Sequence, residues 1–124
     1  MLKDALLVGL GSFLGGSARY VVSKLLPLWI ASPFPIATFA VNIIGCFIIG
    51  LLTALPTEGW LSTNTKLILT TGFCGGFTTF STFMNENNAL IKDGNIMMAA
   101  FYIILSLALG FAAVIMGIQL AKAI

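Results

Sequence analysis

Chemically reactive side chains are scarce in this sequence. It contains no histidine, two cysteines, four acidic and six basic residues among 124. No carboxylate pair or activated nucleophile stands out, so we expect no enzyme. A net charge of +2 without a basic cluster likewise argues against a nucleic-acid partner. Cys46 and Cys74 fall in different apolar segments, so they predict neither a disulfide framework nor a metal motif, and we interpret them as packing residues.

Apolar sequence dominates what is present. Hydrophobic residues make up 59% of the chain and the mean hydropathy is +1.07, values typical of an integral membrane protein. Four apolar stretches can be drawn: Ala5 to Leu26, Ile36 to Leu55, Thr65 to Ile91, and Ile96 to Ala121. The four prolines lie outside these stretches, near their ends, where proline costs least. We therefore predict an all-α membrane protein, with a single four-helix transmembrane domain over residues 1–124.

The third stretch is too long for one straight helix, and it contains the most unusual segment of the chain, Gly72 to Phe83. There Gly75 and Gly76 are followed by Thr78 and Thr79 at the depth of the bilayer core. Backbone that leaves the helix at this depth is tolerated only where protein buries it or where it lines a polar cavity. Broken helices often mark ion sites in transporters. The segment predicts a helix broken in mid-membrane, and we interpret the break as the functional centre.

Polar side chains recur at helical spacing in the other apolar stretches. Thr38 and Asn42 are four residues apart, as are Tyr102 and Ser106, so each pair shares a helix face. A hydroxyl in a membrane helix can simply bond its own backbone, and Tyr102 could belong to an interfacial belt. An amide in hydrocarbon, by contrast, needs partners. These residues predict an uncharged polar track, together with the hydroxyls around the break: Thr78, Thr79, Ser81 and Thr82.

Four side chains allow more than one interpretation. Phe80 and Phe83 are three residues apart and could pack in the core or bind an ion, with ring edges suiting an anion and ring faces a cation. Arg19 lies inside the first apolar stretch. It could reach the membrane interface, stabilise a helix end, or draw anions to a vestibule. Glu86 follows the break, and we expect it to be solvated or to cap a helix.

Positive charge is evenly divided between the two faces of the membrane. If four helices alternate in direction, the cations split into Lys3, Lys66 and Lys122 on one face and Arg19, Lys24 and Lys92 on the other. An excess of Lys and Arg normally sets orientation. Its absence predicts either a weak bias resolved by the first helix or insertion in both orientations. Many transporters contain inverted repeats, and this chain has none, so we expect a second, inverted copy to supply one.

These segments together resemble the Fluc/CrcB family of fluoride channels over nearly the whole chain. The run Gly11 to Tyr20 is similar to the family's first-helix pattern of glycines leading to an arginine and an aromatic residue. The run Thr38 to Gly50 is similar to its second-helix pattern, and Gly72 to Phe83 to its signature, which is the most specific of the three. One difference is Gly110, where some members carry a hydroxyl.

The resemblance implies a dual-topology, antiparallel homodimer of four-helix subunits with two anion pores, in a microbial cytoplasmic membrane. It implies a structural Na⁺ on the two-fold axis, held by the backbone carbonyls of Gly75 and Thr78. Phe80 and Phe83 would form the family's phenylalanine box, and Asn42 would bond the fluoride ion. The other residues that the resemblance implies are Arg19 in the first helix and, along the polar track, Thr38, Ser81, Thr82, Tyr102 and Ser106.

Passive export of cytoplasmic fluoride, giving fluoride resistance, is therefore the predicted function. A small multidrug-resistance-type transporter is the nearest alternative, but it couples export to protons through a carboxylate in its first helix. Here all four carboxylates fall near predicted segment ends. A non-transporting membrane adaptor is the second alternative, and it would need neither a broken helix nor matched polar stripes.

Overall fold

The protein is entirely helical in a computed structural model that describes residues 1–124. Its elements are α1 (Leu2–Trp29), α2 (Ile36–Ala54), α3 (Thr63–Leu67), the π-helix η1 (Ile68–Cys74), α4 (Gly75–Phe77), α5 (Ser81–Lys92) and α6 (Ile96–Ala123). Four segments are long and apolar enough to span a membrane: α1, α2, the combined segment Thr63–Lys92, and α6. The predicted all-α architecture with four candidate spans is confirmed.

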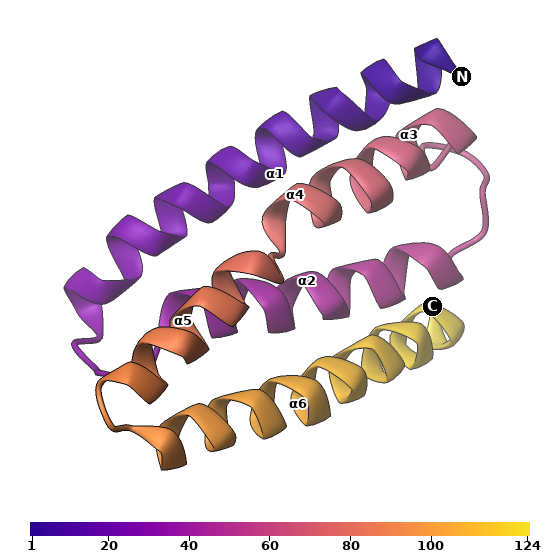
Figure 1. Ribbon diagram of the computed structural model, residues 1–124. Coiled ribbons are helices and arrows are strands. Elements are labelled where there is room, and N and C mark those ends of the chain that lie inside the picture. Colours follow the sequence, from indigo (N-terminus) through magenta and orange to yellow (C-terminus); the bar gives the residue numbers. More distant parts are fainter.

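Successive spans run in opposite directions, so both termini lie at the end of the molecule that also holds the α2–α3 connection (Figure 1). α1 packs along η1 and α4, whereas α2 packs along α6. The alternation places Lys3, Lys66 and Lys122 toward the end with the termini, and Arg19, Lys24 and Lys92 in the half toward the other end. The even division of cations expected from the sequence is therefore present in the folded subunit.

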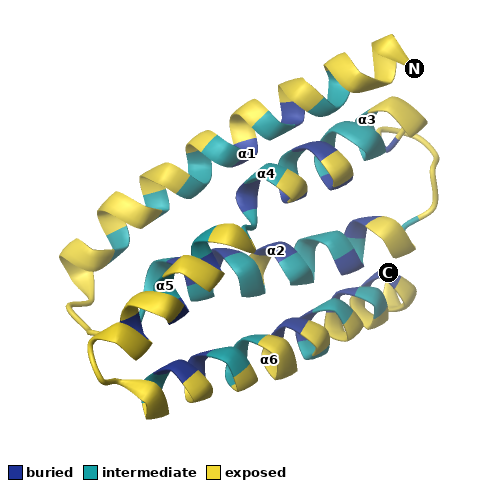
Figure 2. Ribbon diagram, viewed as in Figure 1, coloured by how far each residue is buried: buried dark blue, intermediate teal, exposed yellow.

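Glycines bring the helices into backbone contact. A Cβ on Gly15 would overlap the carbonyl oxygen of Phe73, and a Cβ on Gly117 would overlap that of Phe47. Helices in lipid gain little from the hydrophobic effect, so close packing between small residues supplies much of their attraction. Buried residues face the interior of the bundle, while the outward faces are exposed (Figure 2) and largely apolar, as a lipid-facing surface requires.

Two features of the helices differ from the sequence prediction or were not anticipated. α1 continues through Pro27 to Trp29, so the prediction that all prolines lie outside the helices is wrong for Pro27. Pro27 occupies the last turn of α1, where only one backbone hydrogen bond is lost and the helix is about to end. The π-helix η1 had no counterpart in the prediction. Its Gly72 carbonyl oxygen accepts a hydrogen bond from the Ser12 hydroxyl at 3.2 Å, which links η1 to α1.

Candidate functional site

The third span breaks where the sequence predicted. α4 ends at Phe77, Thr78 is extended with φ −91° and ψ 161°, and α5 begins at Ser81. The backbone N–H and the hydroxyl of Thr78 both donate to the Cys74 carbonyl oxygen, at 3.0 and 2.9 Å. These two bonds complete the last turn before the break, so the chain leaves the helix with the Thr78 donors satisfied.

Asn42 ties the break to α2. Its Nδ2 donates to the Thr79 carbonyl oxygen at 3.0 Å, and its Oδ1 accepts from the Thr79 N–H at 2.8 Å. One side-chain amide therefore satisfies both backbone groups of a residue that has left the helix. An amide NH₂ carries two hydrogens, and the bond to Thr79 uses one of them, so a donor remains for another partner.

Two carbonyl groups at the break lose the partners that a continuous helix would provide. In such a helix the Thr79 N–H would bond Gly75, but here it bonds Asn42 instead. The Thr82 N–H would bond Thr78, but it donates to the Thr79 hydroxyl oxygen at 3.3 Å. Gly75 is also exposed, with no atom within 4 Å of the position that a Cβ would take. Carbonyl oxygens left in this way are suited to a hard cation.

Arg19 lies at the end of α4. Its Nε donates to the Gly76 carbonyl oxygen at 3.1 Å, across the contact between α1 and α4. A cation at the carboxyl end of a helix is favourable because the unpaired carbonyl groups there carry partial negative charge. Of the three interpretations open for Arg19, stabilisation of a helix end is the one that this hydrogen bond supports directly.

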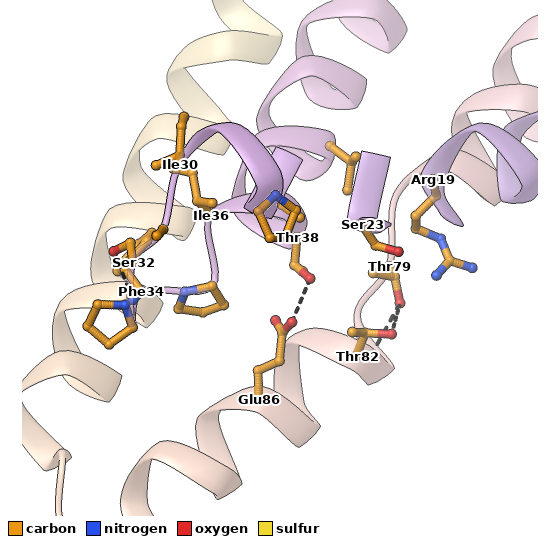
Figure 3. A pocket seen from close by; sticks show the side chains of 16 residues that line it. Arg19, Ser23, Ile30, Ser32, Phe34, Ile36, Thr38, Thr79, Thr82 and Glu86 are labelled. Atoms are coloured by element: carbon orange, nitrogen blue, oxygen red, sulfur yellow. Dashed lines mark hydrogen bonds between the residues drawn. The ribbon is translucent and has the colours of Figure 1, made fainter. Parts of the chain in front are cut away.

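Two cavities meet at the break. The first, which we call the Arg19 cavity, has a volume of about 600 Å³ and is lined by Arg19, Thr38, Thr79, Thr82 and Glu86 together with the α1–α2 connection (Figure 3). The second, the Asn42 cavity, has a volume of about 510 Å³, and its lining includes Asn42, Thr79, Phe80, Phe83 and Ser106. Thr79 lines both cavities, so the residue that Asn42 holds forms part of the wall between them.

Glu86 is held within the bundle by hydrogen bonds, which corrects the expectation of a freely solvated or helix-capping carboxylate. Its side chain is half-buried, and its two carboxylate oxygens accept hydrogen bonds from the Thr38 hydroxyl and the Tyr102 hydroxyl, both at 2.8 Å. It caps no helix end through these bonds. Figure 3 shows Glu86 pointing from α5 toward Thr38 on α2. The carboxylate therefore joins α2, α5 and α6, and it accepts hydrogen bonds from two hydroxyl groups of the predicted polar track.

The predicted aromatic and hydroxyl residues occupy different environments. Phe80 is 70% exposed and Phe83 is 5% exposed, with ring centroids 6.1 Å apart. Tyr102 is fully buried, its ring edge-to-face with Phe83 at 4.8 Å, which excludes an interfacial belt position. Ser106 lines the Asn42 cavity with a buried hydroxyl that has no hydrogen-bond partner. Ser81 is exposed and lines neither cavity.

The sequence did not predict that Glu86 bonds the polar track, nor that the backbone of Thr79 bonds Asn42. Glu86 lies four residues after Thr82, one helical turn away, so its spacing could have placed it on the track. Thr79 was grouped with the hydroxyls of the break, but its backbone, rather than its side chain, forms the contact with Asn42. No side-chain pattern identifies a contact made by backbone atoms.

Known proteins match almost the entire chain. A family model described as "CrcB-like protein, Camphor Resistance (CrcB)" matches residues 6–118. A protein of Chlorobaculum tepidum named "Fluoride-specific ion channel FluC" is 48% identical over 123 residues, which cover 98% of this chain and 97% of the relative. Proteins of the same name from Prosthecochloris aestuarii and Azobacteroides pseudotrichonymphae are 48% and 45% identical, covering 94% and 98% of this chain and 91% and 98% of the relatives.

Proposed function

The chain belongs to the CrcB-like family, and from this premise we propose that it is a fluoride-selective, passive ion channel. It is a multi-pass protein of the cell membrane, with four apolar spans and relatives named as fluoride channels over nearly its full length. The structural observation that carries the proposal is the pair of cavities on either side of the Asn42–Thr79 contact. They bring hydrogen-bond donors to membrane depth along a line that an anion could follow.

Fluoride would exchange its water shell for donors along this path. Asn42 retains a free Nδ2 hydrogen, and the buried Ser106 hydroxyl has no partner within the chain. Phe80 and Phe83 border the same cavity, where their electropositive ring edges suit an anion. Thr38, Thr82 and Tyr102 continue the track near Glu86. Ser81 is exposed and lines neither cavity of a single subunit, so it would contribute only beside a partner.

A sodium ion at the break is the second part of the proposal. The carbonyl oxygens of Gly75 and Thr78 would hold it, since their helical amide partners are diverted to other acceptors. Oxygen ligands suit Na⁺, and unwound carbonyls coordinate it in other transporters. Two carbonyls are too few for a complete coordination shell, so the same pair from a second subunit would have to supply the rest.

An antiparallel homodimer follows from the same considerations. The exposed apolar Phe80, the exposed Gly75 and the balanced cations all fit a subunit that pairs with an inverted copy. Two copies would place the sodium ion on the two-fold axis and give two pores. An inside-negative membrane potential would then expel fluoride with about 2.3 kcal/mol per charge for each 100 mV, without any coupling ion.

The test is anion efflux from liposomes that contain the purified protein. Vesicles are loaded with potassium fluoride or potassium chloride, valinomycin balances the charge, and ion-selective electrodes record release. We expect rapid fluoride release and no chloride release above protein-free vesicles. Asn42→Asp should abolish fluoride release, because a carboxylate oxygen would then face the Thr79 carbonyl oxygen and add a negative charge beside the path.

A pH-gradient arm separates this proposal from a proton-coupled transporter. Glu86 is a half-buried carboxylate within the third span, so proton coupling has a candidate residue to be tested. We expect a pH gradient without valinomycin to drive no net fluoride release. Release of neither ion from folded protein would contradict the channel proposal.

A further inference from the structure

The backbone of the break is held from two sides, and the two sides affect different carbonyl groups. Asn42, from α2, bonds the Thr79 carbonyl, and Arg19, from α1, bonds the Gly76 carbonyl. Gly75 directly precedes the first of these fixed points and Thr78 directly precedes the second. Each carbonyl that would remain for a cation is therefore followed in the chain by one that a side chain satisfies.

Arg19 reaches Gly76 because α1 lies unusually close to α4 at this level. A Cβ on Gly76 would lie 2.6 Å from the Ser12 carbonyl oxygen and 3.0 Å from the Gly16 nitrogen. The guanidinium extends from the following turn of α1 and donates sideways through Nε. Because the bond passes through Nε, the two terminal nitrogens of the guanidinium remain free for other partners.

We propose that Arg19 is a positioning residue for the sodium site: by bonding the Gly76 carbonyl, it holds the last helical turn before the break in place and so keeps the neighbouring carbonyls of Gly75 and Thr78 available for the ion. This inference rests on the sodium part of the proposed function. Adjacent carbonyls of a helical turn point along the axis together, so a turn that frays at Gly76 would also lose the arrangement at Gly75. α4 is the last turn of the continuous helical segment from Thr63 to Phe77, and its carboxyl end is the point where the segment breaks.

Two consequences of removing Arg19 oppose each other, and this makes the sign of the effect informative. Loss of the hydrogen bond disorganises the site and lowers sodium affinity. Loss of the positive charge removes the repulsion between the guanidinium and the sodium ion, and so raises sodium affinity. Glu86 lines the same cavity as Arg19 and partly offsets its field, so we expect the loss of positioning to dominate.

The experiment measures sodium binding through stability, without relying on transport. The midpoint of thermal unfolding of the purified full-length protein in detergent is recorded while N-methyl-D-glucamine is replaced by Na⁺ at constant ionic strength. We expect saturable stabilisation of the unsubstituted protein. Arg19→Met should raise the half-saturating sodium concentration at least tenfold, and Arg19→Lys, which keeps the charge but loses the planar fork, should raise it as well.

Lys24→Met is the matched control, because it removes an exposed cation from the same helix without touching the break. Its half-saturating sodium concentration should not change. A general loss of stability would lower every midpoint without moving that concentration, so it is distinguishable from loss of positioning. If Arg19→Met does not fold, Arg19→Leu, which likewise removes both the charge and the donor, provides the same comparison with Arg19→Lys.

Three results would overturn the inference. An unchanged half-saturating concentration in the Arg19 variants would show that the hydrogen bond to Gly76 does not set sodium affinity. Tighter sodium binding would show that charge repulsion dominates. The absence of any sodium effect on the unsubstituted protein would remove the site that Arg19 is proposed to position, while fluoride release from the same preparation would leave the channel proposal standing.

Discussion

The carboxylate of Glu86 accepts hydrogen bonds from the hydroxyl groups of both Thr38 and Tyr102. Those two hydroxyls belong to the track on which an anion was expected to find donors. Each can donate only one hydrogen, so in this structure neither is free to donate to fluoride. Donation to an anion near Glu86 would therefore require rearrangement of the carboxylate and its partners, whereas Asn42 has an Nδ2 hydrogen that its bond to Thr79 does not use. The Ser106 hydroxyl has no partner either, but it is buried and would have to become accessible first.

Coupling through Glu86 predicts how substitutions of the track should combine. Tyr102→Phe keeps the ring against Phe83 but leaves Glu86 with one partner, and we expect fluoride efflux to fall by about ten- to a hundredfold, since a hydrogen bond to a charged group is worth about 1.5–3 kcal/mol. In a Glu86→Gln background the same substitution should have a clearly smaller effect, because the charged partner is gone. Liposome efflux from the four proteins of this double-mutant cycle measures the coupling.

An equal effect of Tyr102→Phe in both backgrounds would contradict this coupling and indicate that the hydroxyl acts on fluoride independently. Thr53→Ala is a suitable control. The Thr53 hydroxyl bonds the Ile49 carbonyl of its own helix at 2.7 Å, so its removal should leave efflux unchanged.

At the scale of the helices, contact between α1 and the third span depends on glycine rather than on large side chains. Gly11 and Gly15 face η1 so closely that a Cβ on either would overlap its backbone. The π-helix η1 and the break lie on this contact, and the Ser12 and Arg19 hydrogen bonds cross it. α1 is therefore the element against which the irregular backbone of the third span is shaped.

A pair of glycine substitutions in α1 tests this dependence. Gly15→Ala should destabilise the folded protein by about 1–3 kcal/mol or more, because the added methyl group overlaps the Phe73 carbonyl oxygen. Gly9→Ala is the matched control, since no atom lies within 4 Å of its Cβ position, and it should be neutral or slightly stabilising because alanine favours a helix more than glycine does. Thermal unfolding in detergent distinguishes the two. Equal midpoints for both variants would mean that the α1 contact is looser than its geometry indicates.

For the molecule as a whole, the sequence was sufficient to predict the number of apolar spans and the position of the break in the third span. Four long apolar stretches and the glycines and threonines after Phe73 are local signals, and each depends on a few neighbouring residues. The partners of Glu86 and Arg19 could not be predicted in this way, since they join positions 48 and 57 residues apart. The π-helix could not be predicted from its composition either, and it lies against α1, a segment distant in the sequence.

The even distribution of cations implies that removal of a single lysine should bias the orientation of the protein in the membrane. Lys92 lies near one end of the bundle and Lys122 near the other, and both are exposed. Lys92→Ala leaves an excess of positive charge at the end with the termini, and Lys122→Ala leaves it at the opposite end. Because the end richer in Lys and Arg stays in the cytoplasm, the first variant should insert mainly with its termini inside and the second with its termini outside.

Reporter enzymes fused to the carboxyl terminus measure these orientations, and fluoride resistance of cells measures function. The unsubstituted chain should give signals for both orientations. Each variant expressed alone should lose most of its fluoride resistance for lack of an inverted partner, and co-expression of the two should restore it. Full resistance from one variant whose reporters show a single orientation would mean that the functional unit does not require antiparallel subunits.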